Sequence, residues 1–425
     1  MIYVALAFAV LLVLIFLGFP VFLATLITGI VFLVMDGIPM GLIIIRMFGS
    51  INSLSLMAIP FFIIAGNIIM NGGITERLMN FANAGVGFMK GGLGHVNIVT
   101  SMLFAGKQGS GVADAAAVGG MLIPAMEQQG YEKDYAVAVT AASAMLSPVI
   151  PPSIAMILYA YYTGLPVGPL FLGGIVPGAL LVIFQMFVNG WMYRRRGYDI
   201  PRTPFSLKNL LVTAYKSIGA LLMPAIILVG ITTGLVTPTE SGVLAIVYGL
   251  FYGFVITKKL KVTMLPKILL DSAVTSAVVM MTIAATGVMG NVLVRMHFQR
   301  EVLDFAVYTL GSPFAATFFV MFVLIVLGFF LDPTIIIAMF ATTVFALGAV
   351  FNFDPVHFGV VMVIVMQLGA ITPPVGSFLF VACGVGELPL EKSVKPMIPY
   401  IIAILFVVVI LLFIPPLITF LPSIL

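Results

Sequence analysis

The sequence predicts an all-α polytopic membrane protein made of two inverted-topology repeats, each with a re-entrant helical hairpin and a proline-broken transmembrane helix. Three observations support this fold class. Apolar residues make up 62% of the chain and charged residues 8%, whereas roughly 25% are charged in soluble domains. Two adjacent prolines interrupt each of two apolar segments, SPVIPPSI at 147–154 and GAITPPVG at 369–376. One common offset, 222 residues, relates the two interruptions.

The 425 residues suffice for about ten spans of roughly 20 residues with short connections. The start of the chain has no basic region before its apolar run and no polar break after it, so we expect a retained first span rather than a cleaved signal. An amphipathic stretch at 74–88 predicts an interfacial helix, and a second lies near 301–309. Apolar runs predict spans near 2–19, 21–36, 53–70, 133–163 and 167–193, then near 214–235, 239–257, 267–295, 356–386 and 394–420.

Two further regions are apolar but carry a polar or glycine-rich centre. In 92–129, two segments that are too short to span with ease meet at GKQGSG, and in 313–351 two more meet at GFFLDPT. The simplest interpretation is a re-entrant hairpin in each half. The 222-residue offset aligns the halves without a gap from the hairpin tip to the end of the broken helix, with Gly106 opposite Gly328.

These features divide the chain into a first repeat at 1–193, a cytoplasmic linker at 194–213 and a second repeat at 214–425. The broken helices occupy 133–163 and 356–386. Five spanning helices per half is an odd number, so the second half is inverted relative to the first. If the linker is cytoplasmic, most of the 19 Lys and Arg residues lie inside. This satisfies the positive-inside rule and places both termini on the far side.

The breaks follow from the chemistry of proline. A proline has no N–H and excludes the helical conformation from the preceding residue, so Pro151-Pro152 and Pro373-Pro374 must open their helices. Backbone groups freed at membrane depth are tolerated only where protein or a water-filled cavity receives them. An inverted repeat in which each half supplies a hairpin and a broken helix is the architecture of secondary transporters.

Other function classes are disfavoured. No histidine or carboxylate cluster and no nucleophile–base pair appears at membrane depth, so an enzyme is not expected. GKQGSG lacks the spacing of a nucleotide-binding loop. The net charge of +4 is spread over predicted cytoplasmic loops and requires no nucleic-acid partner. Cys383 is the single cysteine, which excludes an internal disulfide, and no organic cofactor is expected.

Several segments resemble one family. They are LSLMAIPFFIIAGNIIMNGGITERL (54–78), MLFAGKQGSGVADAAAVGGMLIPAMEQQGY (102–131), PPSI (151–154), TPTES (237–241) and TPPVG (372–376). In order and spacing they are similar to the large membrane (M) subunit of tripartite ATP-independent periplasmic (TRAP) transporters, of the DctM/SiaM type, over nearly the whole chain.

The resemblance implies a sodium-driven importer of organic acids, such as C4-dicarboxylates or sialic acids, in the bacterial inner membrane. It implies an elevator-type mechanism of the ion-transporter superfamily. The expected partners are a small four-helix membrane subunit (Q type) and a soluble periplasmic substrate-binding protein (P type). Relatives usually carry a Ser-Gly-Ser type sequence at the first hairpin tip, where this chain has Lys107-Gln108-Gly109-Ser110-Gly111. A stand-alone sodium-coupled anion symporter of the same superfamily remains an alternative.

The two breaks predict about two sodium sites. Sodium is a hard cation, and unwound carbonyls with a few hydroxyls supply its oxygens without burying a full negative charge. Interhelical hydrogen bonding is the competing role for each hydroxyl, and an N-cap is the competing role for Asp332. The candidate ligands are Gly106, Ser110, Ser147, Ile150 and Ser153 in the first half and Gly328, Asp332, Gly369, Thr372 and Val375 in the second.

A carboxylate substrate suits the helix N-termini at the hairpin tips and after the breaks, because their N–H groups and partial positive charge attract anions. Lys107 is the single basic residue expected deep in the membrane, and an intramembrane charge is functional by default. Its competing role is a structural ion pair with Asp114. The candidate substrate residues are Lys107, Gln108, Pro152, Ser153, Pro374 and Gly376.

Overall fold

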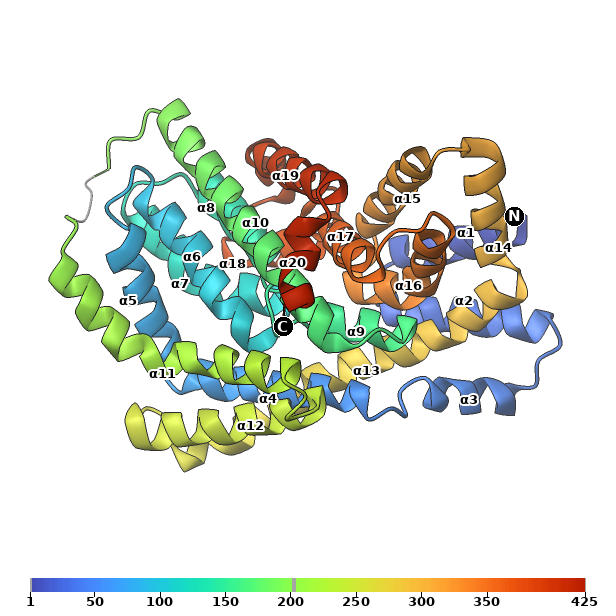
Figure 1. Ribbon diagram of the computed structural model, residues 1–425, viewed down its shortest axis with the longest axis horizontal. Coiled ribbons are helices and arrows are strands. Elements are labelled where there is room, and N and C mark those ends of the chain that lie inside the picture. Colours follow the sequence, from blue (N-terminus) through green and yellow to red (C-terminus); the bar gives the residue numbers. More distant parts are fainter. Residues whose placement is uncertain (1, 201–203, 425) are drawn as a thin grey trace.

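The computed structural model describes residues 2–200 and 204–424, and of Ile2 and Gly106–Gln108 it describes the backbone alone. The fold is helical (Figure 1). The helices of the first half are α1 (Ile2–Phe16), α2 (Val21–Met35), α3 (Met40–Gly49), α4 (Ala58–Asn71), α5 (Ile74–Val86), α6 (Gly92–Gln108), α7 (Gly111–Gln128), α8 (Lys133–Ala144), α9 (Ile154–Thr163) and α10 (Val167–Arg195). Those of the second half are α11 (Leu207–Thr232), α12 (Pro238–Phe251), α13 (Leu265–Arg295), α14 (Phe298–Asp304), α15 (Pro313–Gly328), α16 (Pro333–Val350), α17 (Pro355–Leu368), α18 (Ser377–Val385), α19 (Leu390–Phe413) and α20 (Pro416–Ile424).

The two halves correspond in the hairpin and in the broken helix. Helix α7 covers 111–128 and α16 covers 333–350, so both ends differ by 222 residues, and α8 and α17 begin at 133 and 355 with the same offset. Packing between the halves is reciprocal, since α7 packs on α18 while α16 packs on α9, and α2 packs on α13 while α12 packs on α4. The predicted fold class is therefore confirmed.

Each hairpin turns on a short capped connection. Between α6 and α7, Gly109 has φ +60°, a left-handed conformation that favours glycine, and the Ser110 hydroxyl then accepts a hydrogen bond from the backbone N–H of Ala113. Between α15 and α16, the Asp332 side chain accepts from the N–H of Thr334, and Pro333 follows as the first helical residue. In both hairpins the second helix, α7 or α16, therefore has its N-terminus at the tip.

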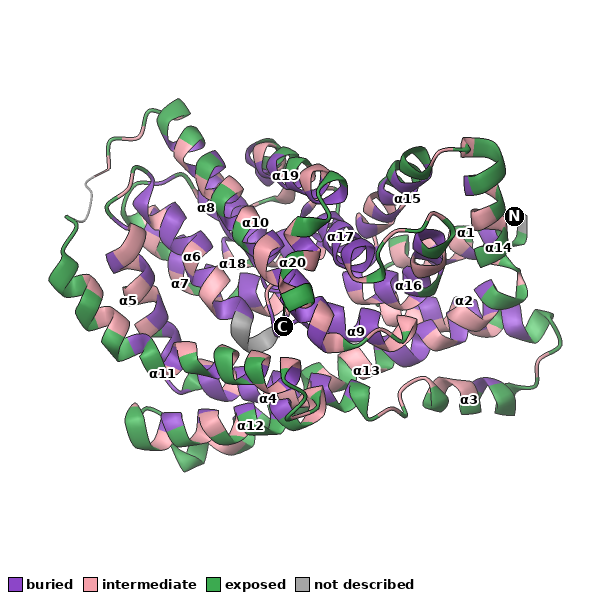
Figure 2. Cartoon of the chain, in the orientation of Figure 1, coloured by how far each residue is buried: buried purple, intermediate pink, exposed green. Residues whose placement is uncertain are grey.

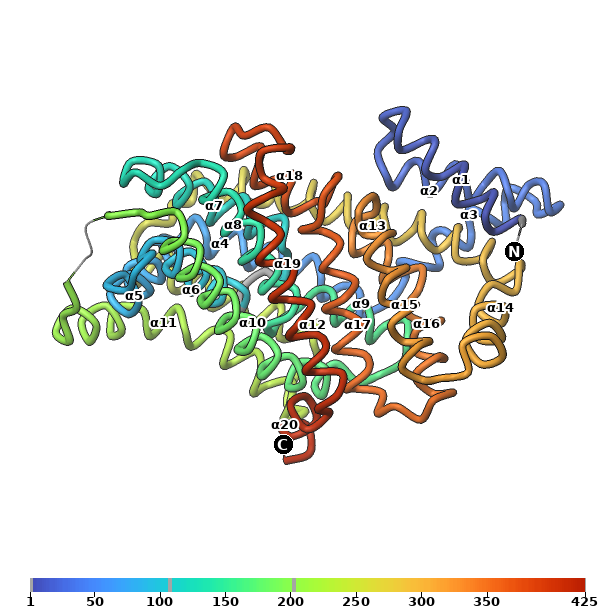
Figure 3. The backbone as a smooth tube through the Cα atoms, turned by 90° about the horizontal axis from the view of Figure 1, so that it is seen from above, coloured from blue at the N-terminus to red at the C-terminus, as the bar shows by residue number. Residues whose placement is uncertain are grey.

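The double prolines interrupt the helices as predicted. Helix α8 ends at Ala144 and α9 begins at Ile154, while α17 ends at Leu368 and α18 begins at Ser377. The bonds Pro151-Pro152 and Pro373-Pro374 are both cis. In the view from above, the broken helices lie in the middle of the molecule, between α1–α3 with α14 on one side and α5 with α11 on the other (Figure 3).

Six of the described helices are long and apolar enough to cross a membrane, and a seventh span results if α4 and α5, bent by 72°, count as one. Exposed residues are frequent on α11, α12 and α3 (Figure 2), and many of them are large and apolar. In a chain of this composition such faces meet lipid, because a bilayer removes the penalty for exposing them. The chain is a multi-pass membrane protein.

Some predicted boundaries were wrong. The last span was expected over 394–420, but α19 ends at Phe413 and α20 begins at Pro416. Pro415-Pro416 is a third double proline and excludes a continuous helix. Helix α3 was not predicted. Helix α11 begins at Leu207, inside the predicted linker, because the Ser206 side chain caps it by accepting from the N–H of Asn209.

Candidate functional site: two hairpin tips against two helix breaks

The first hairpin tip lies directly on the first break. A Cβ added to Gly109 would stand 2.6 Å from the carbonyl oxygen of Pro152 and 2.7 Å from the backbone nitrogen of Ile154. Both contacts are backbone atoms, so they cannot turn away as a side chain can. Only glycine permits this approach, and the tip of the α6–α7 hairpin is thereby held against the start of α9.

The second hairpin tip meets the second break in the same way. A Cβ on Gly328 would stand 2.7 Å from the Cα of Gly369, and one on Gly369 would stand 2.4 Å from the Cα of Gly328. The N–H of Gly376 also donates to the carbonyl of Phe329 at 3.4 Å. Two predicted sodium-site residues, Gly328 and Gly369, are thus brought into contact from segments about 40 residues apart.

The first break offers one hydroxyl that the described residues leave unused. Ser153 donates to the carbonyl of Pro148 and accepts from the N–H of Met156 at 3.1 Å, so it caps α9. Ser147 is 1% exposed, and its hydroxyl has no hydrogen-bond partner among the described residues. A buried polar atom without a partner costs free energy, so the Ser147 oxygen fits a cation ligand. The Ile150 side chain packs on Gly178 of α10.

The second break gathers carbonyl oxygens around a glycine. A Cβ on Gly376 would stand 2.8 Å from the carbonyl oxygen of Thr372 and 2.9 Å from that of Ala370. The Thr372 hydroxyl gives its hydrogen to the carbonyl of Leu368 at 2.8 Å, which leaves its oxygen lone pairs available to a cation. Asp332 caps α16 through the N–H of Thr334 at 2.9 Å, so the competing N-cap role is observed. The Val375 side chain is 41% exposed.

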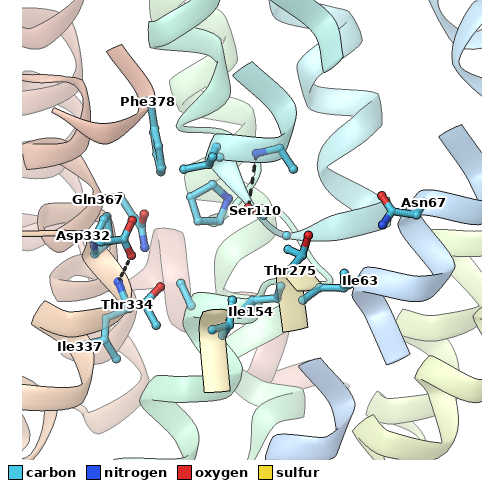
Figure 4. Close-up of a pocket in the computed structure, with 18 residues that line it drawn as sticks. Ile63, Asn67, Ser110, Ile154, Thr275, Asp332, Thr334, Ile337, Gln367 and Phe378 are labelled. Carbon is cyan, nitrogen blue, oxygen red and sulfur yellow. Dashed lines mark hydrogen bonds between the residues drawn. The ribbon is translucent and has the colours of Figure 1, made fainter. Parts of the chain in front are cut away.

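A cavity of about 130 Å³ lies where the two halves meet (Figure 4). In this view Asp332 and Gln367 lie on one side and Asn67 on the opposite side, with Ser110 between them. The lining residues come from the first hairpin tip and break (Gly109, Ser110, Gly111, Val112, Ala113, Pro148, Ile154, Ala155), from the second (Asp332, Pro333, Thr334, Ile337, Gln367, Phe378) and from α4 and α13 (Ile63, Asn67, Thr275, Val279).

First-turn residues of four helices, α7, α9, α16 and α18, line this cavity, and the N-terminus of α16 is already capped by the Asp332 carboxylate. Free N–H groups and partial positive charge at helix starts favour an anion. Of the predicted substrate residues, Pro152, Ser153, Pro374 and Gly376 are not in the lining. The side chains of Lys107 and Gln108 lie outside what the structure describes, and of the predicted sodium ligand Gly106 only the helical backbone is described.

Two lining residues, Gln367 and Phe378, were not predicted from the sequence. Gln367 is 3% exposed and lines the cavity from the end of α17. An amide inside an apolar run is costly in a membrane, and this signal would have singled it out. Asn67 lines the cavity from α4 and donates to the Ser272 hydroxyl at 2.8 Å. Phe378 fills the space left by the missing side chain of Gly111, a long-range contact that no local pattern encodes.

Comparisons with known proteins show the family of this chain. A family model described as "Tripartite ATP-independent periplasmic transporter, DctM component" matches residues 8–417. The sialic acid TRAP transporter large permease protein SiaM of Vibrio cholerae is 32% identical over 405 residues, covering 95% of this chain and 94% of SiaM. The C4-dicarboxylate TRAP transporter large permease protein DctM of Pseudomonas aeruginosa is 35% identical, with 86% of each chain covered.

Two other similarities concern a longer protein and a fold. The sialic acid TRAP transporter permease protein SiaT of Haemophilus influenzae is 35% identical over 88% of this chain, and the chain spans 61% of SiaT. The crystal structure of the YdaH transporter of Alcanivorax borkumensis has a TM-score of 0.56 at 10% identity and covers 86% of each chain, so the two share a fold. On the family match and the relatives, this chain belongs to the DctM family, the large permease component of tripartite ATP-independent periplasmic transporters.

Proposed function

We propose that this chain is the substrate-translocating subunit of a sodium-gradient-driven importer of carboxylate-bearing organic acids. The observation that supports this most strongly is the central cavity, where both hairpin tips meet both breaks and the first turns of four helices converge. A carboxylate is the substrate group that this arrangement suits, because oriented N–H groups receive it without a buried cation. The names of relatives specify sialic acid and C4-dicarboxylate, which both carry carboxylates.

Sodium coupling is the second part of the proposal. The Ser147 hydroxyl lacks a described partner, and the carbonyls of Ala370 and Thr372 converge at Gly376. These oxygens would hold one sodium at each break, and the cation would compensate the negative charge of the substrate nearby. Gly109 and Gly328 contribute by bringing each tip onto its break.

We further propose the assembly and the location. The chain works in the bacterial inner membrane with a small four-helix subunit and a periplasmic substrate-binding protein, and both of its termini face the periplasm. Family membership supports the partners. The positive-inside rule supports the sidedness, because the basic triplet Arg194-Arg195-Arg196 ends α10 and four lysines lie between α12 and the first turn of α13.

The test is reconstitution of the chain with its small subunit in proteoliposomes that carry an inward sodium gradient. Uptake of N-acetylneuraminate and of succinate is measured with and without the cognate binding protein. We expect uptake of a carboxylate only when the binding protein is present. Full uptake without that protein would contradict the tripartite assembly and favour a stand-alone symporter.

A further inference from the structure

A second, larger cavity of about 580 Å³ lies beside the central one. Its lining is rich in polar side chains and comes from the end of α3, from α9, α13, α14 and α16, and from the loop before α14. The lining polar residues are Ser50, Tyr162, Thr286, Asn291, His297, Gln299, Arg300, Asp304, Thr342 and Thr343.

The two cavities follow one another along the same three helices. On α13 the central cavity is lined by Val279 and the outer one begins at Thr286, a separation of about 10 Å at 1.5 Å per residue. On α9 the corresponding residues are Ala155 and Tyr162, and on α16 residue Ile337 is followed directly by Ala338. All three helices run from the central cavity toward the C-terminal end of α13, which carries Arg295. The lysines lie at the opposite, N-terminal end of α13.

A cation lies directly behind a lining residue of this outer cavity, although it does not line the cavity itself. The guanidinium of Arg46 on α3 donates to the side-chain oxygen of Asn291, which lines the cavity. The Asn291 amide in turn donates to the carbonyl of Gly287 at 2.8 Å, so the asparagine is fixed from both sides. Ser50, one turn after Arg46, packs on Gly287 so closely that a Cβ there would stand 1.9 Å from its hydroxyl oxygen.

Arg46 differs from the other outer arginines in its charge partner. Arg295 forms an ion pair with Asp36 at 2.8 Å, and Arg300 lies 3.7 Å from Asp304. No carboxylate of the described residues forms an ion pair with Arg46, which is half-buried. An arginine carries five N–H donors in a fork that matches a carboxylate. One hydrogen bond to Asn291 leaves further donors for an anion.

We propose that this outer cavity is a second anion site, an entry vestibule in which a carboxylate is held by Arg46 before it reaches the central site. The inference rests on the proposed function of carboxylate transport, which it deepens. The polar wall solvates the remainder of the substrate, and the shared helices α9, α13 and α16 provide the path inward. The vestibule lies on the predicted periplasmic side, where the binding protein delivers its ligand.

The experiment uses Cys383, the single cysteine of the chain. In a Cys383→Ala background, Thr342→Cys places a thiol on an exposed lining position of the vestibule. The full chain with its small subunit is reconstituted, and two impermeant thiol reagents of similar size are added outside. One is anionic, sulfonatoethyl methanethiosulfonate, and one is cationic, trimethylammonioethyl methanethiosulfonate. Their rate ratio is divided by the ratio for a free thiol in solution.

We expect the anionic reagent to be favoured and Arg46→Gln to lower the corrected ratio about fivefold, the size of one partly screened charge interaction. Arg46→Lys is expected to retain most of the preference. The double substitution Arg295→Gln with Asp36→Asn is the matched control and is expected to leave the ratio unchanged, because it removes an ion pair without a change in net charge. Saturating N-acetylneuraminate or succinate is expected to slow labelling, and the effective one identifies the acid that the vestibule accepts.

Three results would overturn the proposal: a ratio that Arg46→Gln leaves unchanged, labelling that occurs from the cytoplasmic side alone, or labelling rates that neither acid affects. Sodium-driven uptake by the Cys383→Ala chain, measured in parallel, separates these results from a failure of the proposed function. Should Thr342→Cys fold poorly, Gln299→Cys on α14 reports on the same cavity.

Discussion

The contact between Gly328 and Gly369 gives the sharpest prediction for the second break. A Cβ on Gly369 would stand 2.4 Å from the Cα and 2.7 Å from the carbonyl carbon of Gly328, whereas ordinary van der Waals contact is 3.4–4 Å. Gly369→Ala must therefore separate the hairpin tip from the break by about 1 Å, and overpacking of this kind costs about 1–3 kcal/mol. If sodium binds only when the hairpin tip contacts the break, this cost couples the contact to sodium binding and weakens sodium binding by the same free energy.

A coupling of about 1–3 kcal/mol corresponds to about 5–150-fold in affinity. We therefore expect Gly369→Ala to raise the sodium concentration for half-maximal uptake at least about fivefold in proteoliposomes, and to lower the thermal unfolding midpoint in detergent. Gly384→Ala is the matched control, because its added Cβ would meet no heavy atom within 4 Å. If Gly369→Ala loses stability while its sodium dependence equals that of the control, the tip–break contact is structural and the reasoning is refuted.

Three further predictions concern single side chains. Ser147→Ala is expected to leave thermal stability unchanged, because its buried hydroxyl has no described partner, and to raise the sodium concentration for half-maximal uptake. Ser143→Ala, which breaks hydrogen bonds to Asn97 and Ser101, is expected to lower thermal stability and to leave that sodium concentration unchanged. Equal behaviour of the two variants would contradict the ligand role of Ser147. Asp332→Asn should keep the α16 cap and its stability, whereas Asp332→Ala should lose about 1 kcal/mol of the unfolding free energy, measured by thermal unfolding; equal losses would argue against a cap. Phe378→Leu should enlarge the cavity beside Gly111 and increase uptake of N-acetylneuraminate relative to succinate. An unchanged ratio of the two uptake rates in competition assays would show that this ring does not limit substrate size.

The sequence predicted best what covalent chemistry dictates locally. Pro151-Pro152 and Pro373-Pro374 open their helices whatever the surroundings, because the missing N–H and the steric restriction belong to proline itself. The same rule applied to Pro415-Pro416 would have placed the end of α19 correctly. A turn at a hairpin tip can likewise be predicted from its glycine, since Gly109 adopts the positive φ that glycine favours.

The contacts between distant segments could not be predicted in this way. The register that sets Gly328 on Gly369 depends on how the second hairpin packs against the second broken helix, and the hydrophobic pattern of a membrane helix leaves its rotation unspecified. For the same reason Thr275 on α13 was not expected in the central cavity. The proposed sodium ligands at both breaks remain predictions, with Ser147 and the carbonyls at Gly376 the best supported by geometry.

Sodium-driven import is tested by uptake against a concentration gradient in proteoliposomes that contain the chain, its small subunit and the cognate binding protein. Radiolabelled N-acetylneuraminate and succinate are followed with sodium high outside, with sodium equal on both sides, and with potassium in its place. Sodium-driven import predicts accumulation of one acid above its external concentration only under the inward sodium gradient. Accumulation that persists after the sodium gradient is collapsed would contradict it.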